Sequence, residues 1–130
     1  MKRGHRTGAP RPLSTAELEL IEALLGAAGA RGGRYLGQLP RVRVVGGCGC
    51  GCPSIDLEVG DGLREGAPKP LIVADAESPE GVPVGVILWV RGGALSGLEV
   101  HPWHGTGGVR LPRIESLMTL RNRETRSRPV

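Results

Sequence analysis

The chain has 130 residues, enough for one domain, and its 22 glycines and 11 prolines favour strands and turns over a mainly helical fold. No run approaches the roughly 18 apolar residues of a membrane helix, and the first residues lack the apolar stretch of a signal peptide. We therefore expect a cytoplasmic protein with no membrane partner, whose cysteines are reduced thiols or metal ligands.

Charge is distributed unevenly along the chain. The net charge of +4 combines +4 on residues 1–13, +3 on residues 121–130 and −3 on residues 14–120. Both ends contain too few apolar residues to pack into a hydrophobic core. This predicts a basic flexible tail over 1–13, a single domain over 14–120 and a second basic tail over 121–130.

The first predicted element is a helix that begins after Ser14. Ser14 and Glu17 have the spacing of a capping box, in which each side chain accepts a hydrogen bond from the backbone of the other residue. At 100° per residue the apolar side chains form one stripe, which consists of Leu18, Leu20, Ile21, Leu24 and Leu25. The pattern predicts a helix over 15–26, ended by the glycines between Gly26 and Gly33.

After Pro40 the apolar period changes to two, which is typical of strands. An unbroken apolar run over 84–90 predicts a central strand, because both of its faces suit burial. The strands expected in chain order cover 41–45, 55–59, 71–74, 84–90 and 94–103.

Gly92-Gly93 offers a two-residue turn and therefore predicts a β-hairpin over 84–103. The simplest register places Trp89 opposite Ser96 and Ile87 opposite Leu98. On that register, we expect the face with Trp89 and Ile87 to pack on the helix. The other face, with Glu99 and His101, is then partly exposed.

Apolar residues between Leu111 and Leu120 suggest a short C-terminal helix that opens near Pro112. The fold class predicted is therefore α+β, with the N-terminal helix packed on a mostly antiparallel sheet of about four to five strands.

Three cysteines alternate with glycines at Cys48, Cys50 and Cys52. Thiolates are strong zinc ligands, so these residues are candidate metal ligands, with His101 or His104 as the fourth. Same-face residues of an extended strand stand roughly 6.5 Å apart, so the segment must curl to hold one ion. Close packing of small residues is the favoured alternative, and a redox pair is the third.

Other candidate sites are weaker. Glu99 and His101 share a strand face, as do Asp56 and Glu58, which suggests either an acid–base patch or ordinary cross-strand charge pairs. The phosphate-binding loop, the dinucleotide fingerprint, the serine nucleophile elbow and the HExxH metalloprotease motif are all absent from the sequence. No motif therefore indicates an enzyme.

Two segments resemble a group of small bacterial hypothetical proteins. They are Cys48-Gly-Cys-Gly-Cys52-Pro-Ser-Ile-Asp-Leu57 and Val90-Arg-Gly-Gly-Ala-Leu-Ser-Gly-Leu-Glu-Val100. The resemblance covers roughly residues 14–112. It implies a leading helix, a cysteine-glycine strand entry and a glycine-turn hairpin, and it implies no activity, cofactor or catalytic residue.

Three functions follow as hypotheses. The first is a non-enzymatic module, immunity-like or regulatory, that binds another protein through its sheet. The second is a small zinc-binding protein built on Cys48, Cys50, Cys52 and His101. The third is a nucleic-acid accessory protein whose arginine-rich tails neutralise phosphates.

Overall fold

The computed structural model describes residues 10–47, 52–60, 65–105 and 108–119. These residues form two α-helices and one antiparallel sheet of seven strands, in the order β1-β2-β3-β6-β5-β4-β7, so the α+β class is confirmed. The sheet has seven strands rather than four or five because two-residue strands extend both of its edges. The elements are β1 (Arg11–Pro12), α1 (Thr15–Ala27), α2 (Ala30–Leu36), the 3-10 turn η1 (Leu39–Arg41), β2 (Val42–Gly47), β3 (Ile55–Val59), β4 (Lys69–Glu77), β5 (Pro83–Arg91), β6 (Ala94–Pro102), the 3-10 turn η2 (Ile114–Ser116) and β7 (Met118–Thr119).

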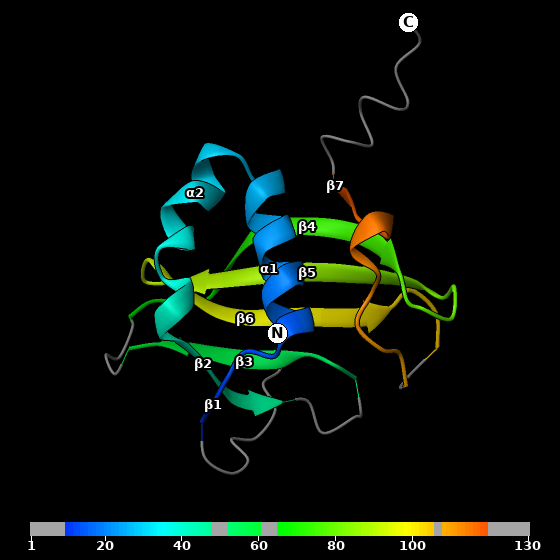
Figure 1. The fold of residues 1–130 in the computed structure, drawn as a ribbon, viewed down its shortest axis with the longest axis horizontal. Helices are drawn as coiled ribbons and strands as arrows, with labels where there is room; N and C mark the ends of the chain where they lie inside the picture. The colour runs from blue at the N-terminus through cyan, green and yellow to red at the C-terminus, as the bar shows by residue number, and fades with distance from the viewer. Residues whose placement is uncertain (1–9, 48–51, 61–64, 106–107, 120–130) are drawn as a thin grey trace, which may run out of the picture.

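Both helices lie on the same side of the sheet, where they cover its inner face (Figure 1). Four apolar side chains of α1, those of Leu20, Ile21, Leu24 and Leu25, are at most 1% exposed. They meet a sheet surface of aliphatic side chains only, which agrees with the absence of phenylalanine. Its central members are Val42, Val44, Ile55, Leu57, Val59, Val84, Val86, Leu88, Leu98 and Val100.

The hairpin at 84–103 is confirmed, but its predicted register is wrong. Val90 pairs with Leu95 and Trp89 pairs with Gly97, so Ser96 is an extra residue that forms a β-bulge. A slip of one residue moves every side chain beyond it to the opposite face. Val84, Val86 and Leu88 therefore face the helices with 0% exposure, while the Ile87 and Trp89 positions alternate with them and lie on the other side.

Two other predictions about helices are corrected. The glycines after Gly26 do not end the helical region, because α2 follows at once after Gly29, whose φ of 67° reverses the chain. The short C-terminal helix is wrong: residues 114–116 make a single 3-10 turn and Met118–Thr119 form β7, paired with β4. Pro112 fixes one backbone angle but cannot supply the packed apolar face that a longer helix needs.

Glu17 links the start of α1 to the strand that precedes it. Its carboxylate accepts hydrogen bonds from the Ser14 backbone at 2.8 Å and from two guanidinium nitrogens of Arg11 at 2.9 Å, and Ser14 Oγ caps the Glu17 backbone. The capping box is therefore confirmed. Arg11 belongs to the predicted tail 1–13, yet it pairs within β1 against β2.

Burial raises the pKa of Glu17, but the hydrogen bonds from Arg11 and Ser14 outweigh burial and hold the pKa below its ordinary value. A lowered pKa stabilises the fold above the ordinary carboxyl pKa of about 4.3, and this stabilisation is lost as the pH falls through the folded-state pKa. We expect Glu17→Gln to reduce the free energy of unfolding by about 1–3 kcal/mol at neutral pH. Urea unfolding at several pH values measures it.

The difference between wild type and Glu17→Gln should shrink once the pH is below about 4. Glu19→Gln is the control, because Glu19 is exposed on the same helix. A difference that persists unchanged into acid would contradict the role given to the ionised carboxylate.

Gly32 and Gly33 form a second matched pair within α2. A Cβ on Gly32 would overlap the backbone of Leu25 in α1, whereas a Cβ on Gly33 meets nothing within 4 Å. We expect Gly32→Ala to destabilise the fold by about 1–3 kcal/mol through overpacking. We expect Gly33→Ala to stabilise it by about 0.5–1 kcal/mol through the entropy of the unfolded chain. Thermal unfolding of both variants is the measurement, and equal effects would show that the two helices do not touch at Gly32.

Candidate functional site

The side of the sheet away from α1 and α2 carries the side chains that sequence analysis singled out as charged or chemically active. On β3 the buried residues Ile55, Leu57 and Val59 alternate with half-buried acidic ones. Buried residues also alternate with half-buried or exposed ones over 73–77 of β4, 86–89 of β5 and 98–101 of β6. We call this surface the outer face; its members are Asp56, Glu58, Val73, Asp75, Ile87, Trp89, Glu99 and His101.

Strand pairing sets these side chains in rows across the sheet. Val73 pairs with Ile87, and Ile87 pairs with Glu99. This row therefore consists of two apolar side chains followed by a carboxylate. In the row on one side, Asp56 and Trp89 both pair with Gly97. In the row on the other side, Asp75 and His101 both pair with Gly85. The outer face therefore has an apolar centre with acidic side chains around it.

Glu99 connects the tryptophan to the histidine. Its Oε1 accepts a hydrogen bond from Trp89 Nε1 at 3.0 Å, and its Oε2 lies 3.4 Å from His101 Nδ1. A carboxylate beside an imidazole nitrogen orients the ring. Of the charged positions that the sequence placed on one strand face, Glu99 and His101 are thus in contact within β6, and the Trp89 indole of β5 bonds the same carboxylate. The acid–base interpretation stays a prediction.

The imidazole of His101 lies against the backbone of Gly85. A Cβ on Gly85 would stand 2.8 Å from His101 Nε2 and 2.9 Å from Cε1. Because Gly85 has no side chain, the His101 ring can pack directly against its backbone. On β6 the same ring contacts Glu99. The side chain of His101 is still 47% exposed, so it belongs to a surface and not to an enclosed catalytic centre.

The structure describes only part of the predicted zinc site. Cys48 and Cys50 lie outside the described residues. Cys52 Sγ is 3.4 Å from Ser54 Oγ, which in turn bonds the backbone N–H and carbonyl of Val100 at 2.8 and 3.1 Å. This brings the Cys52 segment beside the residue that precedes His101. Among the described residues no three His, Cys, Asp or Glu side chains are grouped to hold a metal ion. The zinc hypothesis stays a prediction.

The remaining predictions about sites have mixed outcomes. His104 is exposed and follows Trp103, whose side chain is 54% exposed. Most of both basic tails, 1–9 and 120–130, lies outside the described residues, so nucleic-acid binding through them stays a prediction. Within the described ranges no helix has the length and apolarity to cross a membrane.

The outer positions of Val73, Ile87 and Trp89 were missed. For β4 a signal was available, because Val73, Asp75 and Glu77 alternate with the small residues Ala74 and Ala76. For β5 the sequence offered none, since the run is apolar at successive positions and only the bulge at Ser96 selects the buried set.

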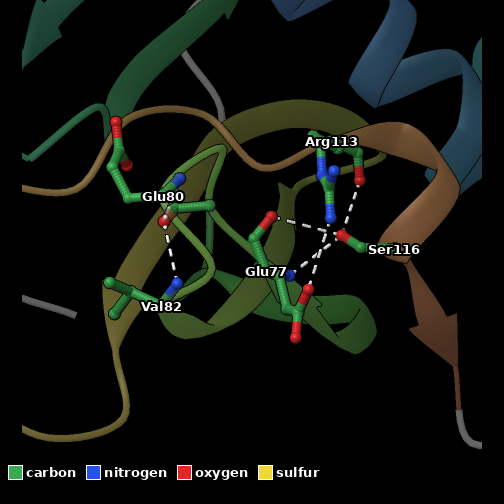
Figure 2. A network of polar contacts seen from close by, with 6 residues as sticks. Glu77, Glu80, Val82, Arg113 and Ser116 are labelled. Atoms are coloured by element: carbon green, nitrogen blue, oxygen red, sulfur yellow. Dashed lines mark hydrogen bonds and ion pairs between the residues drawn. The ribbon is translucent and has the colours of Figure 1, made fainter.

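The backbone edge of β4 that faces away from β5 is largely occupied. β7 pairs with Ala74 and Asp75, and the guanidinium of Arg31 donates to the Leu71 carbonyl. At the end of the strand the Glu77 N–H donates to Ser116 Oγ at 2.9 Å, and the Arg113 N–H donates to the Glu77 carbonyl at 3.1 Å (Figure 2). These contacts use the groups that would otherwise pair with an added strand.

Comparisons with protein-family models, curated proteins and solved structures find no match to this chain. The resemblance to small bacterial proteins therefore stays a prediction. Function has to be argued from the outer face itself.

Gly85→Ala tests the arrangement of His101. The added methyl group should displace the half-exposed ring and separate it from Glu99, at a cost in stability below about 1 kcal/mol. Nuclear Overhauser contacts from the imidazole to residues 85 and 99 measure the displacement. Gly47→Ala is the control, because the nearest atom to its Cβ is 3.7 Å away. Imidazole contacts with Glu99 that survive in Gly85→Ala would show that the ring is not held by the glycine.

Proposed function

We propose that this protein is a non-enzymatic binding module whose outer face docks on another protein, and that the docking surface of this partner is basic. The observation that carries the proposal is Val73, a β-branched residue 54% exposed in the interior of β4 and flanked on β5 by the half-buried Ile87. An aliphatic side chain gains about 25 cal/mol per Å² of apolar area removed from water, so a partner that covers this pair gains affinity.

The composition of the outer face supports protein docking. Interfaces combine an apolar core, often with tryptophan, and a polar rim. Val73, Ile87 and Trp89 supply such a core, and the hydrogen bond from Trp89 to Glu99 holds the indole in one orientation before binding. A side chain that is already ordered loses less entropy when the partner arrives.

The charge of the outer face supports a basic partner. Its carboxylates are Asp56, Glu58, Asp75 and Glu99. The cations on the same side are Arg43, which pairs across from Glu58, and Arg91, two residues beyond Trp89 on β5. Complementary charge raises the rate of association and rejects acidic proteins. Residues 14–120 also carry a net charge of −3, so the surrounding field has the same sign.

Docking on the face is favoured over the addition of a strand to the sheet. Strand addition needs an edge with unpaired backbone groups. On β4 the contacts described above occupy much of that edge, and on β2 the first strand pairs with Arg43 and Val44.

Val73→Lys should weaken partner binding about tenfold or more. A lysine beside Ile87 on the outer face repels a basic partner and removes apolar contact, while the exposed position tolerates the change. The matched control is Val82→Lys, because Val82 is 37% exposed in the turn between β4 and β5, away from the outer face. Affinity capture from native extract with wild type and both variants identifies proteins that depend on Val73.

A protein identified in this way is then purified and titrated. We expect Val73→Lys to weaken its binding about tenfold or more, as for an interface centre, and Val82→Lys to leave binding within about twofold. Binding should weaken as salt rises. A partner that binds both lysine variants alike, or the recovery of no protein that distinguishes them, would refute docking through the outer face.

A further inference from the structure

The described chain ends at the edge of the sheet, on β7 beside β4. Strand β7 pairs Thr119 with Ala74 and Met118 with Asp75, so the chain continues from the edge of β4. Val73 and Asp75, the neighbours of Ala74 on β4, are both members of the outer face. The residues that follow, 120–130, carry Arg121, Arg123, Arg126 and Arg128 against a single Glu124.

We propose that residues 120–130 of the same chain are a built-in competitor that docks on the outer face and lowers its affinity for a partner. The inference rests on the proposed function, since it assigns a regulator to the same surface. The occupant has the chemistry proposed for the partner: a basic segment that also contains Leu120, Pro129 and Val130.

The segment is long enough to cross the face. Eleven extended residues span at most about 36–40 Å. Three steps between neighbouring strands separate β4 from β3, and at about 4.8 Å per step these amount to about 14–15 Å. Arginines in this segment can therefore reach Asp75, Glu99 and Asp56 in turn without strain.

Arginine suits the groups that the face presents. A guanidinium binds a carboxylate through two parallel hydrogen bonds and also stacks on an indole. The row that contains Asp56, Gly97 and Trp89 offers both partners two strands apart. A tethered segment acts at an effective concentration in the millimolar range, so weak contacts are enough for substantial occupancy.

The N-terminal basic segment is less well placed than the C-terminal one to bind the outer face. It enters the sheet through β1, where Arg11 is already bound to Glu17. Between β1 and the carboxylates of β3 lies β2 with Arg43, a like charge that pairs across from Glu58. The C-terminal segment instead leaves the sheet beyond Ala74, in the direction of Val73.

A labelled peptide tests the competition in the full-length protein. The probe is fluorescein-labelled Leu-Arg-Asn-Arg-Glu-Thr-Arg-Ser-Arg-Pro-Val, which copies residues 120–130. Its binding is followed by fluorescence anisotropy with wild type and with a full-length variant in which Arg121, Arg123, Arg126 and Arg128 are all changed to Gln. We expect the variant to bind the peptide about fivefold more tightly or better, because its own segment no longer competes.

Two further pairs of changes, made in the four-glutamine variant, locate the peptide. Asp56→Asn with Asp75→Asn removes two charges from the outer face and should weaken peptide binding about fivefold or more. Glu19→Gln with Glu22→Gln removes two charges from the exposed side of α1 and should leave peptide binding within about twofold. Both pairs lower the net negative charge equally, so general attraction predicts equal effects.

Each outcome decides the inference. Equal peptide affinity of wild type and the four-glutamine variant, absent binding to both, or equal effects of the two acid pairs would overturn it. A copy of residues 1–11 that binds better than the C-terminal peptide would also do so. None of these results depends on a captured partner, and the Val73→Lys comparison uses no peptide, so failure of the competitor and failure of the docking surface are distinguishable.

Discussion

The β-bulge at Ser96 decides which half of the hairpin side chains is buried. With Ser96 outside the ladder, Leu88 pairs with Leu98 and Val86 with Val100, and all four are 0% exposed beneath the helices. In the register without the bulge, Ile87 and Trp89 would take those positions. The aliphatic core and the composition of the outer face are thus two consequences of one inserted residue.

Similar insertions recur in the neighbouring strands. On β2 the register shifts between Val44 and Gly46, and on β4 it shifts between Pro70 and Ile72. The extra residues, Val45 and Leu71, are both buried, so each bulge adds an apolar side chain to the interior. Bulges also increase the local twist and bend of strands, which suits a sheet that packs on two helices of unequal length.

The parts of the fold with local signals were predictable. The capping box and apolar stripe located α1 to within a residue, and alternation located β3 at Ile55–Val59. The second helix was not predictable, because Gly32 and Gly33 disfavour a helix locally and α2 exists through the close approach of Gly32 to Leu25. The same holds for β7, which is two residues long and depends on pairing with β4.

The candidate site was also predictable only where its signals were local. Glu99 and His101 were correctly placed on one strand face, since period-two alternation is a local property. Their contacts with other strands were not predicted. The hydrogen bond from Trp89 to Glu99 and the packing of the His101 ring against Gly85 both follow from the shifted register. Sequence analysis found Asp56, Glu58, Glu99 and His101, did not single out Asp75 or Val73, and assigned Ile87 and Trp89 to the face that packs on the helix.

The proposed docking on an acidic outer face creates a problem of self-recognition in a chain with arginine-rich ends. Electrostatic attraction between a face and a basic segment does not distinguish the segment of another copy from its own. Under the proposed competition, attachment decides between them, because a short tether gives an effective concentration in the millimolar range. A partner must then exceed the tethered segment in apolar contact as well as charge. The side chains that provide this margin are Val73, Ile87 and Trp89, so the apolar centre supplies the selectivity that charge alone cannot.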